Sequence, residues 1–289
     1  MKFEYLEPKT VKEAVSLLEK YGKKAKVIAG GTDLVVQMKD GQISPSYVIS
    51  LSRIPDLDGI EQGTSGVRIG ALTRIGTLEK SSVLKSKYPA AAQAASQMAS
   101  PGIRNMATVG GNLCSASPGS DMAPALMVLD ASVRIEGLAG PRELPLSEFF
   151  TGPWSTVLGA GEIMVSIYAP EPHSGIGSAY LKCAARKNDT AIIGAGAAIT
   201  IEDGICRSAR LALSAGAPTP IRARSAETFL EGKQIGEPEI FRAGNLAAAE
   251  AKPRLDSVRV CPEYRRSMVS VFVRRAIAAA IAHIEEAAG

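Results

Sequence analysis

The stretch 108–131, TVGGNLCSASPGSDMAPALMVLDA, constrains this chain more than any other part of its sequence. It consists mostly of glycine, serine and small apolar residues, and it contains almost no side chain that could act as an acid, a base or a nucleophile. Glycine lets the main chain approach a ligand closely and adopt a positive φ. The stretch therefore indicates a binding surface, not a set of catalytic side chains.

Composition places the chain among ordinary soluble globular proteins. Its 289 residues are 46% hydrophobic and 21% charged, with a net charge of +4, and they are enough for one large domain or for two or three small ones. The lysines and arginines are scattered, without the basic stripe and interleaved aromatics that nucleic-acid binding requires. We therefore expect no nucleic-acid partner.

The N-terminus and the cysteines exclude further classes. MKFEYLEPKT lacks the apolar core of a signal peptide, and no uninterrupted apolar run reaches the ~18 residues of a membrane span. We expect a cytoplasmic protein without a membrane span. Four separated cysteines without a CxxC pair, together with only two histidines, argue against a zinc site, an iron–sulfur cluster held by this chain or a disulfide framework.

The order of the expected elements divides the chain into three units. In residues 1–55, a helix over 10–22 with Thr10 as its N-cap, a buried strand KVIA and a second strand at 46–54 predict a small α/β unit. Residues 56–172 contain short strands such as GVRIGALT and ASVRIEG and a helical stretch over 87–99. Residues 173–289 contain alternating strand patterns and a final helix over about 262–288. These patterns predict an α+β fold whose last part is a sheet with a helix-rich end.

Two double-glycine turns are the places where a ligand can be argued from the residues. AGGTDL at 29–34 follows a strand, and its N–H groups can converge on an anion. We expect Gly110 and Gly111 to repeat this turn shape, and they are followed by neutral hydrogen-bonding side chains and one carboxylate, at Asn112, Ser115, Ser117, Ser120 and Asp121. Amides and hydroxyls of this kind suit a diphosphate with sugars at its ends.

Simpler interpretations apply to the same residues. A single double-glycine turn is usually only a turn, and Asp121 could be the N-cap of the helix MAPALMVLDA, either instead of contacting a ligand or in addition to it. The stretch IIGAGAAI resembles the start of a dinucleotide fingerprint, but Ile199 occupies the position of the third glycine. We interpret it as a packed strand, and His283 as a surface or packing histidine.

The two turns with their flanks resemble a known family. VIAGGTDL followed by ATVGGNLCSASPGSDMAPALMVLDA is similar to the FAD-binding medium subunits of the molybdenum hydroxylases, the group that includes carbon monoxide dehydrogenase and xanthine dehydrogenase. FEYLEPKTVKEAVSLL, PGIRNMATVGGNL, AYLKCAARKNDTAIIGAGAAI and DSVRVCPEYRRSMVSVFVRRAI resemble further family segments, in the same order. The likeness extends over essentially the whole chain.

The resemblance implies a fold and a cofactor. The fold is a two-subdomain FAD-binding fold of the vanillyl-alcohol oxidase type, in units 1–55 and 56–172, followed by a C-terminal flavoprotein domain in 173–289. Carried over to this sequence, the FAD-binding residues are Lys26, Val27, Ile28, Ala29, Gly30, Gly31, Thr32, Asp33, Leu34, Met98, Ala107, Thr108, Gly111, Asn112, Cys114, Ser115, Ser120, Asp121 and Lys182. No catalytic side chain and no metal ligand is implied.

Three roles within this set are more specific. Gly30, Gly31 and Thr32 would give amides and a hydroxyl to the diphosphate, and Asp121 would accept a hydrogen bond from a ribose or ribityl hydroxyl. Lys182 would lie near the flavin ring, where a cation favours the anionic reduced form. From the residues alone, Lys182 could equally be a solvent-facing strand residue.

The resemblance also implies partners. A molybdopterin-binding large subunit would oxidise the substrate, a small [2Fe-2S] subunit would relay the electrons, and this chain would pass them through FAD to NAD or another acceptor. Two alternatives are a free-standing FAD oxidoreductase, which would need its own acid or base such as Tyr180 or His173, and a flavin-free accessory module. The intact glycines and Asp121 argue against the loss of flavin.

Overall fold

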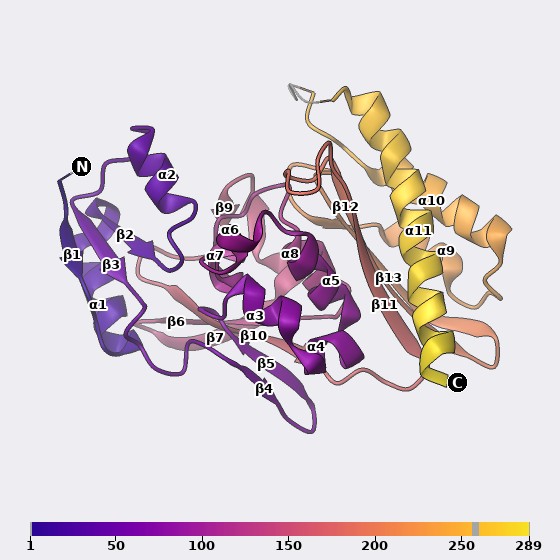
Figure 1. Cartoon of the computed structure of the whole chain (residues 1–289), viewed down its shortest axis with the longest axis horizontal. Helices are drawn as coiled ribbons and strands as arrows, with labels where there is room; N and C mark the ends of the chain where they lie inside the picture. Colours follow the sequence, from indigo (N-terminus) through magenta and orange to yellow (C-terminus); the bar gives the residue numbers. More distant parts are fainter. Residues whose placement is uncertain (1, 256–259, 289) are drawn as a thin grey trace.

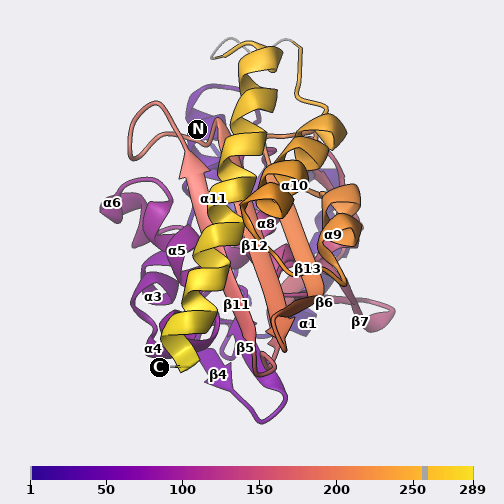
Figure 2. The same cartoon turned by 90° about the vertical axis from the view of Figure 1, so that its right-hand side faces the viewer.

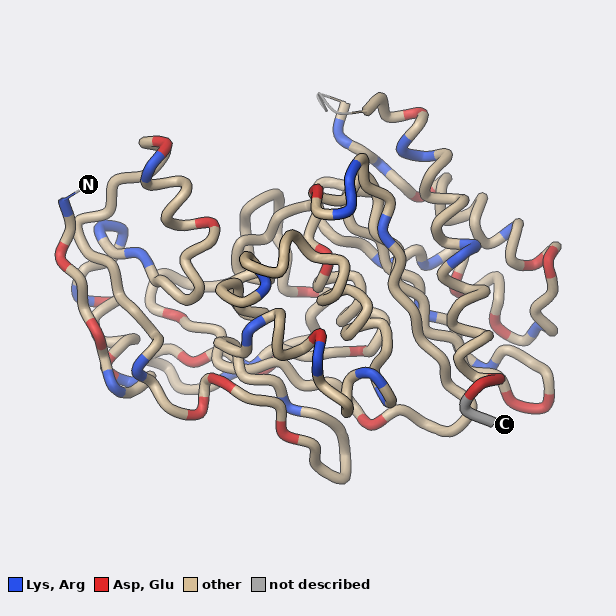
Figure 3. Tube along the Cα trace, viewed as in Figure 1, with Lys and Arg blue, Asp and Glu red and all other residues tan. Residues whose placement is uncertain are grey.

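The computed structural model describes residues 2–255 and 260–288. Residues 256–259, which open the segment DSVRVCPEYRR, lie outside the described residues. Figure 1 shows three units side by side along the long axis, with the N-terminus in the first and the C-terminal helix in the last. Figure 3 shows positive and negative positions interspersed along all three.

The first unit is a three-stranded parallel sheet with strand order β1-β3-β2. Its elements are β1 (Glu4–Leu6), α1 (Val11–Tyr21), the 3₁₀ turn η1 (Gly22–Lys24), β2 (Ala25–Ile28), α2 (Leu34–Lys39) and β3 (Tyr47–Ser50). The predicted N-cap of α1 is confirmed, because Thr10 Oγ1 accepts a hydrogen bond from the backbone N–H of Glu13. The same glutamate reaches back to the backbone N–H of Lys9.

The second unit contains a five-stranded antiparallel sheet with strand order β4-β5-β10-β6-β7. Its strands are β4 (Ile60–Gln62), β5 (Gly66–Gly70), β6 (Ser132–Gly137), β7 (Gly140–Pro145) and β10 (Ile163–Pro170), with a small hairpin of β8 (Phe150–Gly152) and β9 (Ser155–Thr156). Its helices are α3 (Ile75–Lys80), α4 (Ser82–Lys87), α5 (Pro89–Gln97), α6 (Pro101–Arg104), α7 (Val109–Cys114), α8 (Met122–Met127) and the 3₁₀ turn η2 (Leu146–Glu148). The predicted helical stretch over 87–99 is thus α5.

The third unit is an antiparallel sheet with helices on both faces. Its elements are β11 (Ile176–Cys183), β12 (Ile193–Glu202), β13 (Ile205–Ser214), β14 (Ile221–Arg222), α9 (Arg224–Leu230), α10 (Glu237–Glu250) and α11 (Pro262–Ala288). Helices α9 to α11 cover the outer face, where α11 runs along β11 and β12 (Figure 2), and α5 and α8 of the second unit contact the other face. The interpretation of IIGAGAAI as a packed strand is confirmed, since it forms the buried start of β12.

The two faces of this sheet belong to two different hydrophobic cores, because buried side chains along its strands alternate between them. Ala197 and Leu211 point toward the helices α9 to α11, whereas Tyr180, Ala198 and Ala212 belong to the core of the second unit. Successive side chains of a strand point to opposite faces, so one buried strand can serve both cores. The second and third units therefore share packed interior.

The three larger sheets each fall within one of the ranges 1–55, 56–172 and 173–289. Their cores cross these limits, because the core of the first unit also includes Ile163 and Val165 of β10. The division into three domains stays a prediction. What the packing establishes is a chain of three cores joined by shared side chains.

Helix α11 combines a buried face with a long apolar sequence. By length and composition alone, its segment Pro262–Glu286 could cross a membrane, with a mean hydropathy of 1.4 in its most apolar window. Charged residues such as Arg274 and Arg275 interrupt its apolar sequence, so it contains no uninterrupted apolar run of that length. In the structure it packs against β11, β12 and α10 and buries five apolar side chains in the outer core: Val269, Val273, Ala276, Ile277 and Ala280.

The close approach of α11 to β11 depends on Gly177, because a Cβ there would overlap the backbone carbonyl oxygen of Ala280. We expect Gly177→Ala to lower the free energy of unfolding by about 1–3 kcal/mol, since a backbone group cannot move aside as a side chain can. Urea denaturation measures the change. Gly102→Ala is the matched control, because its Cβ would meet only Ser100 Oγ at 3.9 Å, and it should be nearly neutral. Equal stability of the two variants would contradict this packing.

Candidate functional site

A cavity of about 620 Å³ lies between the first and second units. Its walls come from the segment 26–34 of the first unit, from the segment 98–121 of the second, and from residues 188–190 of the third. The structure thus brings together nearly all of the predicted binding residues, although they come from separate parts of the chain. Among these predicted residues, only Ile28 and Lys182 are outside the lining.

The first wall is the loop that leaves β2 and enters α2. Gly31 adopts a φ of 73°, a conformation that glycine reaches without steric cost. The carbonyl oxygens of Gly31 and Asp33 accept hydrogen bonds from Val35 and Gln37, each at 3.0 Å. The backbone N–H groups of residues 30–33 donate to no other group in the described part of the chain. They form a set of free donors of the kind that binds anions.

The two walls touch at Gly30. A Cβ on this residue would overlap the carbonyl oxygen of Met106 and would lie 3.0 Å from the Cα of Ala107. Absence of a side chain at Gly30 therefore lets the loop of the first unit meet the backbone of the second. This contact sets how closely the two walls approach each other.

The second double glycine has a different role from the first. It lies in the short helix α7, where Thr108 is the N-cap and its Oγ1 accepts a hydrogen bond from Gly111 N at 3.1 Å. Gly110 N donates to Ala71 O at 2.9 Å, and a Cβ on Gly110 would lie 2.7 Å from that oxygen. The expectation that both turns have the same shape is wrong, because here both N–H groups are used internally and the glycine serves close packing.

Hydroxyl and amide groups follow α7 along the cavity. Ser120 Oγ donates to Asn112 Oδ1 at 2.7 Å and accepts from Ala123 N at 3.3 Å. Ser115 Oγ donates to Asn112 O at 3.0 Å. Asp121 occupies the expected N-cap position of α8, but its side chain makes no capping bond there, and Ser120 Oγ accepts from the N–H of Ala123 in the first turn instead.

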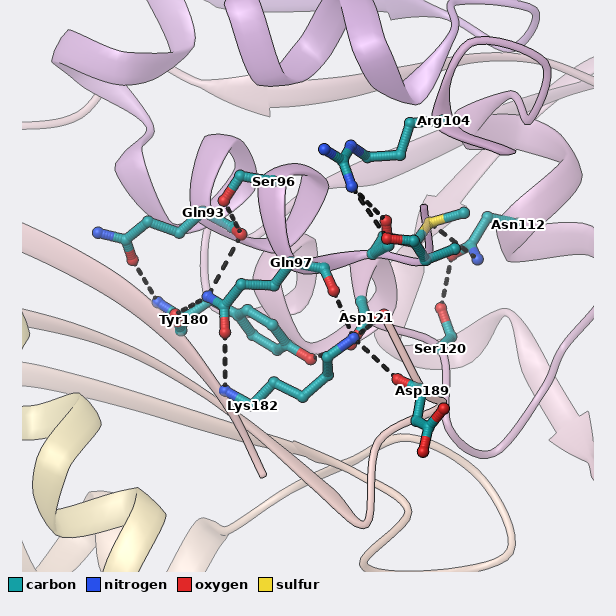
Figure 4. Close-up of polar contacts among 12 residues, drawn as sticks. Gln93, Ser96, Gln97, Arg104, Asn112, Ser120, Asp121, Tyr180, Lys182 and Asp189 are labelled. Atoms are coloured by element: carbon teal, nitrogen blue, oxygen red, sulfur yellow. Dashed lines mark hydrogen bonds and ion pairs between the residues drawn. The ribbon is translucent and has the colours of Figure 1, made fainter. Parts of the chain in front are cut away.

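The carboxylate of Asp121 is instead part of a buried polar cluster with Tyr180 and Lys182 (Figure 4). The Tyr180 hydroxyl donates to Oδ1 at 2.6 Å, and Lys182 Nζ donates to Oδ2 at 3.2 Å. Burial raises the pKa of Asp121 above its usual value, and this outweighs the lowering by Lys182 and Tyr180. Burial, together with Asp121, raises the pKa of Tyr180 well above its usual value, so the phenol stays protonated.

Lys182 is a buried cation whose hydrogen-bonding capacity is used. Its side chain is 3% exposed, so the interpretation as a solvent-facing strand residue is wrong. Its ammonium group donates to the carbonyl oxygens of Gln97 and Asp189 and to Asp121, which matches its three N–H donors. The structure places this lysine behind the Asp121 carboxylate. Its role beside a flavin ring stays a prediction.

Two glutamines of α5 position the strand that carries this cluster, and the sequence interpretation missed both. Gln93 Oε1 accepts from Tyr180 N at 2.8 Å, while Gln97 donates to Tyr180 O and accepts from Lys182 N (Figure 4). Because β11 is an edge strand, its outer backbone groups would otherwise lack partners. The available signal was a pair of glutamines four positions apart on a helix otherwise rich in alanine.

The remaining lining residues offer no evident nucleophile. Burial raises the pKa of the Cys114 thiol to about 12, so it is protonated at neutral pH. Trp154, which the sequence interpretation also missed, is exposed at the cavity with a φ of 60°. Across residues 2–255 and 260–288, no group of three histidine, cysteine or acidic side chains is arranged to hold a metal ion. The cavity can bind and orient a ligand through amides, hydroxyls and one buried carboxylate.

Comparisons with known proteins agree over the whole chain. The profile for the FAD binding domain in molybdopterin dehydrogenase matches residues 1–172, and that for the CO dehydrogenase flavoprotein C-terminal domain matches residues 178–280. The chain is 35% identical over 275 residues to the carbon monoxide dehydrogenase medium chain of Afipia carboxidovorans, with 95% of each chain covered. It is 32% identical to the xanthine dehydrogenase FAD-binding subunit of Escherichia coli O157:H7, with 94% of each covered.

A solved structure gives the same result for the fold. Carbon monoxide dehydrogenase from Hydrogenophaga pseudoflava, in a form that lacks the Mo-pyranopterin moiety, contains a chain that superposes with a TM-score of 0.95. That chain is 36% identical, and the match covers 98% of both chains. The expected α+β FAD-binding fold is thereby confirmed.

The buried ion pair at the cavity allows a prediction about the free energy of unfolding that can be tested without a ligand. Lys182→Met or Asp121→Asn alone leaves one buried polar partner without its counterpart, and each should lower the free energy of unfolding by about 3–5 kcal/mol. In the double variant neither charge remains, so its loss should be clearly smaller than the sum of the two. Urea denaturation of the wild type, the two single variants and the double variant gives the four free energies of this double-mutant cycle. Additive losses would show that the two side chains do not stabilise each other.

Proposed function

The chain belongs to the family of FAD-binding subunits of the molybdenum hydroxylases, and from that premise we propose that the cavity between its first two units is the FAD site. As a member it is an oxidoreductase subunit that binds FAD and transfers electrons within a heteromeric complex. When bound, FAD supplies the redox chemistry. The chain's own residues bind and orient the cofactor.

The free N–H groups of residues 30–33 are the observation that carries this proposal. A diphosphate is an anion, and several unpaired backbone donors on one loop satisfy its oxygens without a cost for breaking internal hydrogen bonds. A cavity of about 620 Å³ is also within the size range of cofactor sites. We assign the diphosphate to Gly30, Gly31 and Thr32.

The second wall suits the uncharged parts of the same cofactor. Asn112, Ser115 and Ser120 line it with amide and hydroxyl groups, and Asp121 presents a carboxylate. An ionised carboxylate only accepts hydrogen bonds, so it selects hydroxyl groups and repels phosphates. We assign Asp121 to a ribose or ribityl hydroxyl. Lys182 donates a hydrogen bond to that carboxylate and fixes its position.

The remaining site assignments and the wider setting belong to the same proposal. The cavity-facing positions among the predicted residues contact FAD, and the chain is built of domains 1–55, 56–172 and 173–289. Its partners are a molybdopterin-binding large subunit and a [2Fe-2S] small subunit, and the electrons leave through NAD or another acceptor. The complex is cytoplasmic. The medium chains of multi-subunit dehydrogenases among the relatives support this arrangement.

The proposal predicts about one FAD per chain and a specific loss of binding at Gly31. Gly31→Ala puts a Cβ at a φ of 73° and within 3.2 Å of Ile28, so the donor loop must change shape. We expect FAD affinity to fall about ten-fold or more, because one left-handed alanine costs roughly 1–2 kcal/mol. Titration of the deflavinated full chain with FAD, followed by flavin absorption, gives the affinity.

Gly41→Ala is the matched control for this measurement. Gly41 has a φ of 69°, but nothing lies within 4 Å of a Cβ there, and the residue is outside the cavity. Both variants carry the same backbone strain, and only one of them alters the donor loop. Equal FAD affinity of the two variants would exclude the loop as the diphosphate site. A wild-type chain that retains no FAD after incubation with excess FAD and its partner subunits would favour the accessory-module alternative.

A further inference from the structure

Three successive carbonyl groups at the end of α5 face buried cations. The carbonyl oxygen of Gln97 accepts from Lys182 Nζ, and those of Met98 and Ala99 accept from Arg104 Nη1 at 3.0 and 2.9 Å (Figure 4). Arg104 is itself 8% exposed, and Glu79 holds the rest of its guanidinium through Nε at 2.8 Å and Nη2 at 3.2 Å. The guanidinium is therefore fixed on both sides.

The segment that Arg104 holds is a strained part of the cavity wall. Met98 and Ala99 line the cavity, but Arg104 does not. Ala99 has a φ of 42°, a left-handed conformation that costs a residue with a Cβ roughly 1–2 kcal/mol. Such a conformation persists only where the surroundings stabilise it. The two hydrogen bonds from Arg104 to the carbonyls on either side of the Ala99 Cα provide that stabilisation.

The orientation of the carbonyls determines the orientation of the N–H groups. The peptide bonds are trans, so the N–H of Ala99 points away from the Met98 carbonyl, and the N–H of Ser100 points away from the Ala99 carbonyl. Both carbonyls face Arg104, which is outside the cavity lining, so both N–H groups point to the opposite side of the turn; Ala99 lines the cavity there, whereas Ser100 does not. Neither N–H donates to another group in the described residues.

We propose that Arg104 is a positioning residue for the redox-active ring of FAD: it holds the Met98–Ala99 turn so that the N–H of Ala99 faces the ring, with the N–H of Ser100 directed to the same side of the turn. The proposal rests on the proposed function of the cavity. The ring carries carbonyl and nitrogen acceptors in one plane, and two neighbouring N–H donors match such an edge. The thioether of Met98, which lines the cavity beside them, is a favourable neighbour for an aromatic ring.

The electrostatic consequence is a shift of the flavin potential. Reduction places additional electron density on the ring, and N–H donors directed at it stabilise that charge more than they stabilise the oxidised ring. Arg104 is outside the cavity lining, so its loss should disturb the N–H groups without removing a direct contact to the ring. We expect R104Q to make the flavin midpoint potential more negative, to change the shape of the flavin absorption band and to lower FAD affinity about ten-fold.

A rescue separates positioning from general stabilisation. Glycine adopts the left-handed conformation without a steric cost, so A99G should restore part of the FAD affinity and of the potential in R104Q/A99G. Loss of the Arg104–Glu79 ion pair, by contrast, is not repaired by a glycine at 99. If R104Q does not fold, R104K and R104K/A99G are compared in the same way, because lysine keeps the charge but loses the fork that contacts Glu79 and both carbonyls together.

R222Q is the matched control. Arg222 pairs with Glu227 in the third unit, its side chain is as buried as that of Arg104, and it is outside the cavity lining. R222Q should lower stability while leaving the potential, absorption band and FAD affinity of the full chain unchanged. The proposal is overturned if folded Arg104 variants keep the wild-type flavin potential and band shape, whatever their FAD affinity. It is also overturned if adding A99G to an Arg104 variant restores neither the FAD affinity nor the potential. A wild-type chain that binds no FAD would instead refute the site itself.

Discussion

The ion pair between Asp121 and Lys182 is the interaction on which the arrangement of this molecule depends. It joins the start of α8 in the second unit to the edge strand of the third, and it lies beside the cavity that the first unit closes. Two buried charges are tolerated only while each has its partner and further hydrogen bonds. Tyr180, Gln97 and the carbonyl of Asp189 supply those bonds, so helix α5, strand β11 and the loop after it are fixed together.

Two double-glycine sequences that look alike serve opposite physical purposes. At the first, the backbone N–H groups of residues 30–33 have no internal partner among the described residues, which suits an anionic ligand. At the second, the N–H of Gly110 donates to Ala71 and the N–H of Gly111 donates to Thr108. The missing side chain of Gly110 allows α7 to pack closely against Ala71, directly after β5. The first is therefore a loop suited to bind a ligand, and the second lies in a helix that brings polar side chains of the second wall close to that ligand.

Local patterns predicted what depends on local physics. The cap at Thr10, the strand at β12 and the final helix follow from neighbouring residues, and family resemblance brought the cavity residues together. The partners of Asp121 could not be predicted, because Tyr180 and Lys182 approach it only when the third sheet docks on α5 and α8. The role of Gln93 and Gln97 depends on β11 being an edge strand, which is a property of the complete sheet.

The alternation of side chains in β11 to β13 has a consequence for how such chains change in evolution. Tyr180, Ala198 and Ala212 belong to the interior of the preceding unit, although they lie in the C-terminal sheet. An exchange of the C-terminal part between relatives, cut in the connection before β11, would separate these side chains from the helices they evolved against. A recombined chain keeps this packing only if the sheet and the helices α5 and α8 come from the same parent. We therefore expect residues 89–214 to be inherited together.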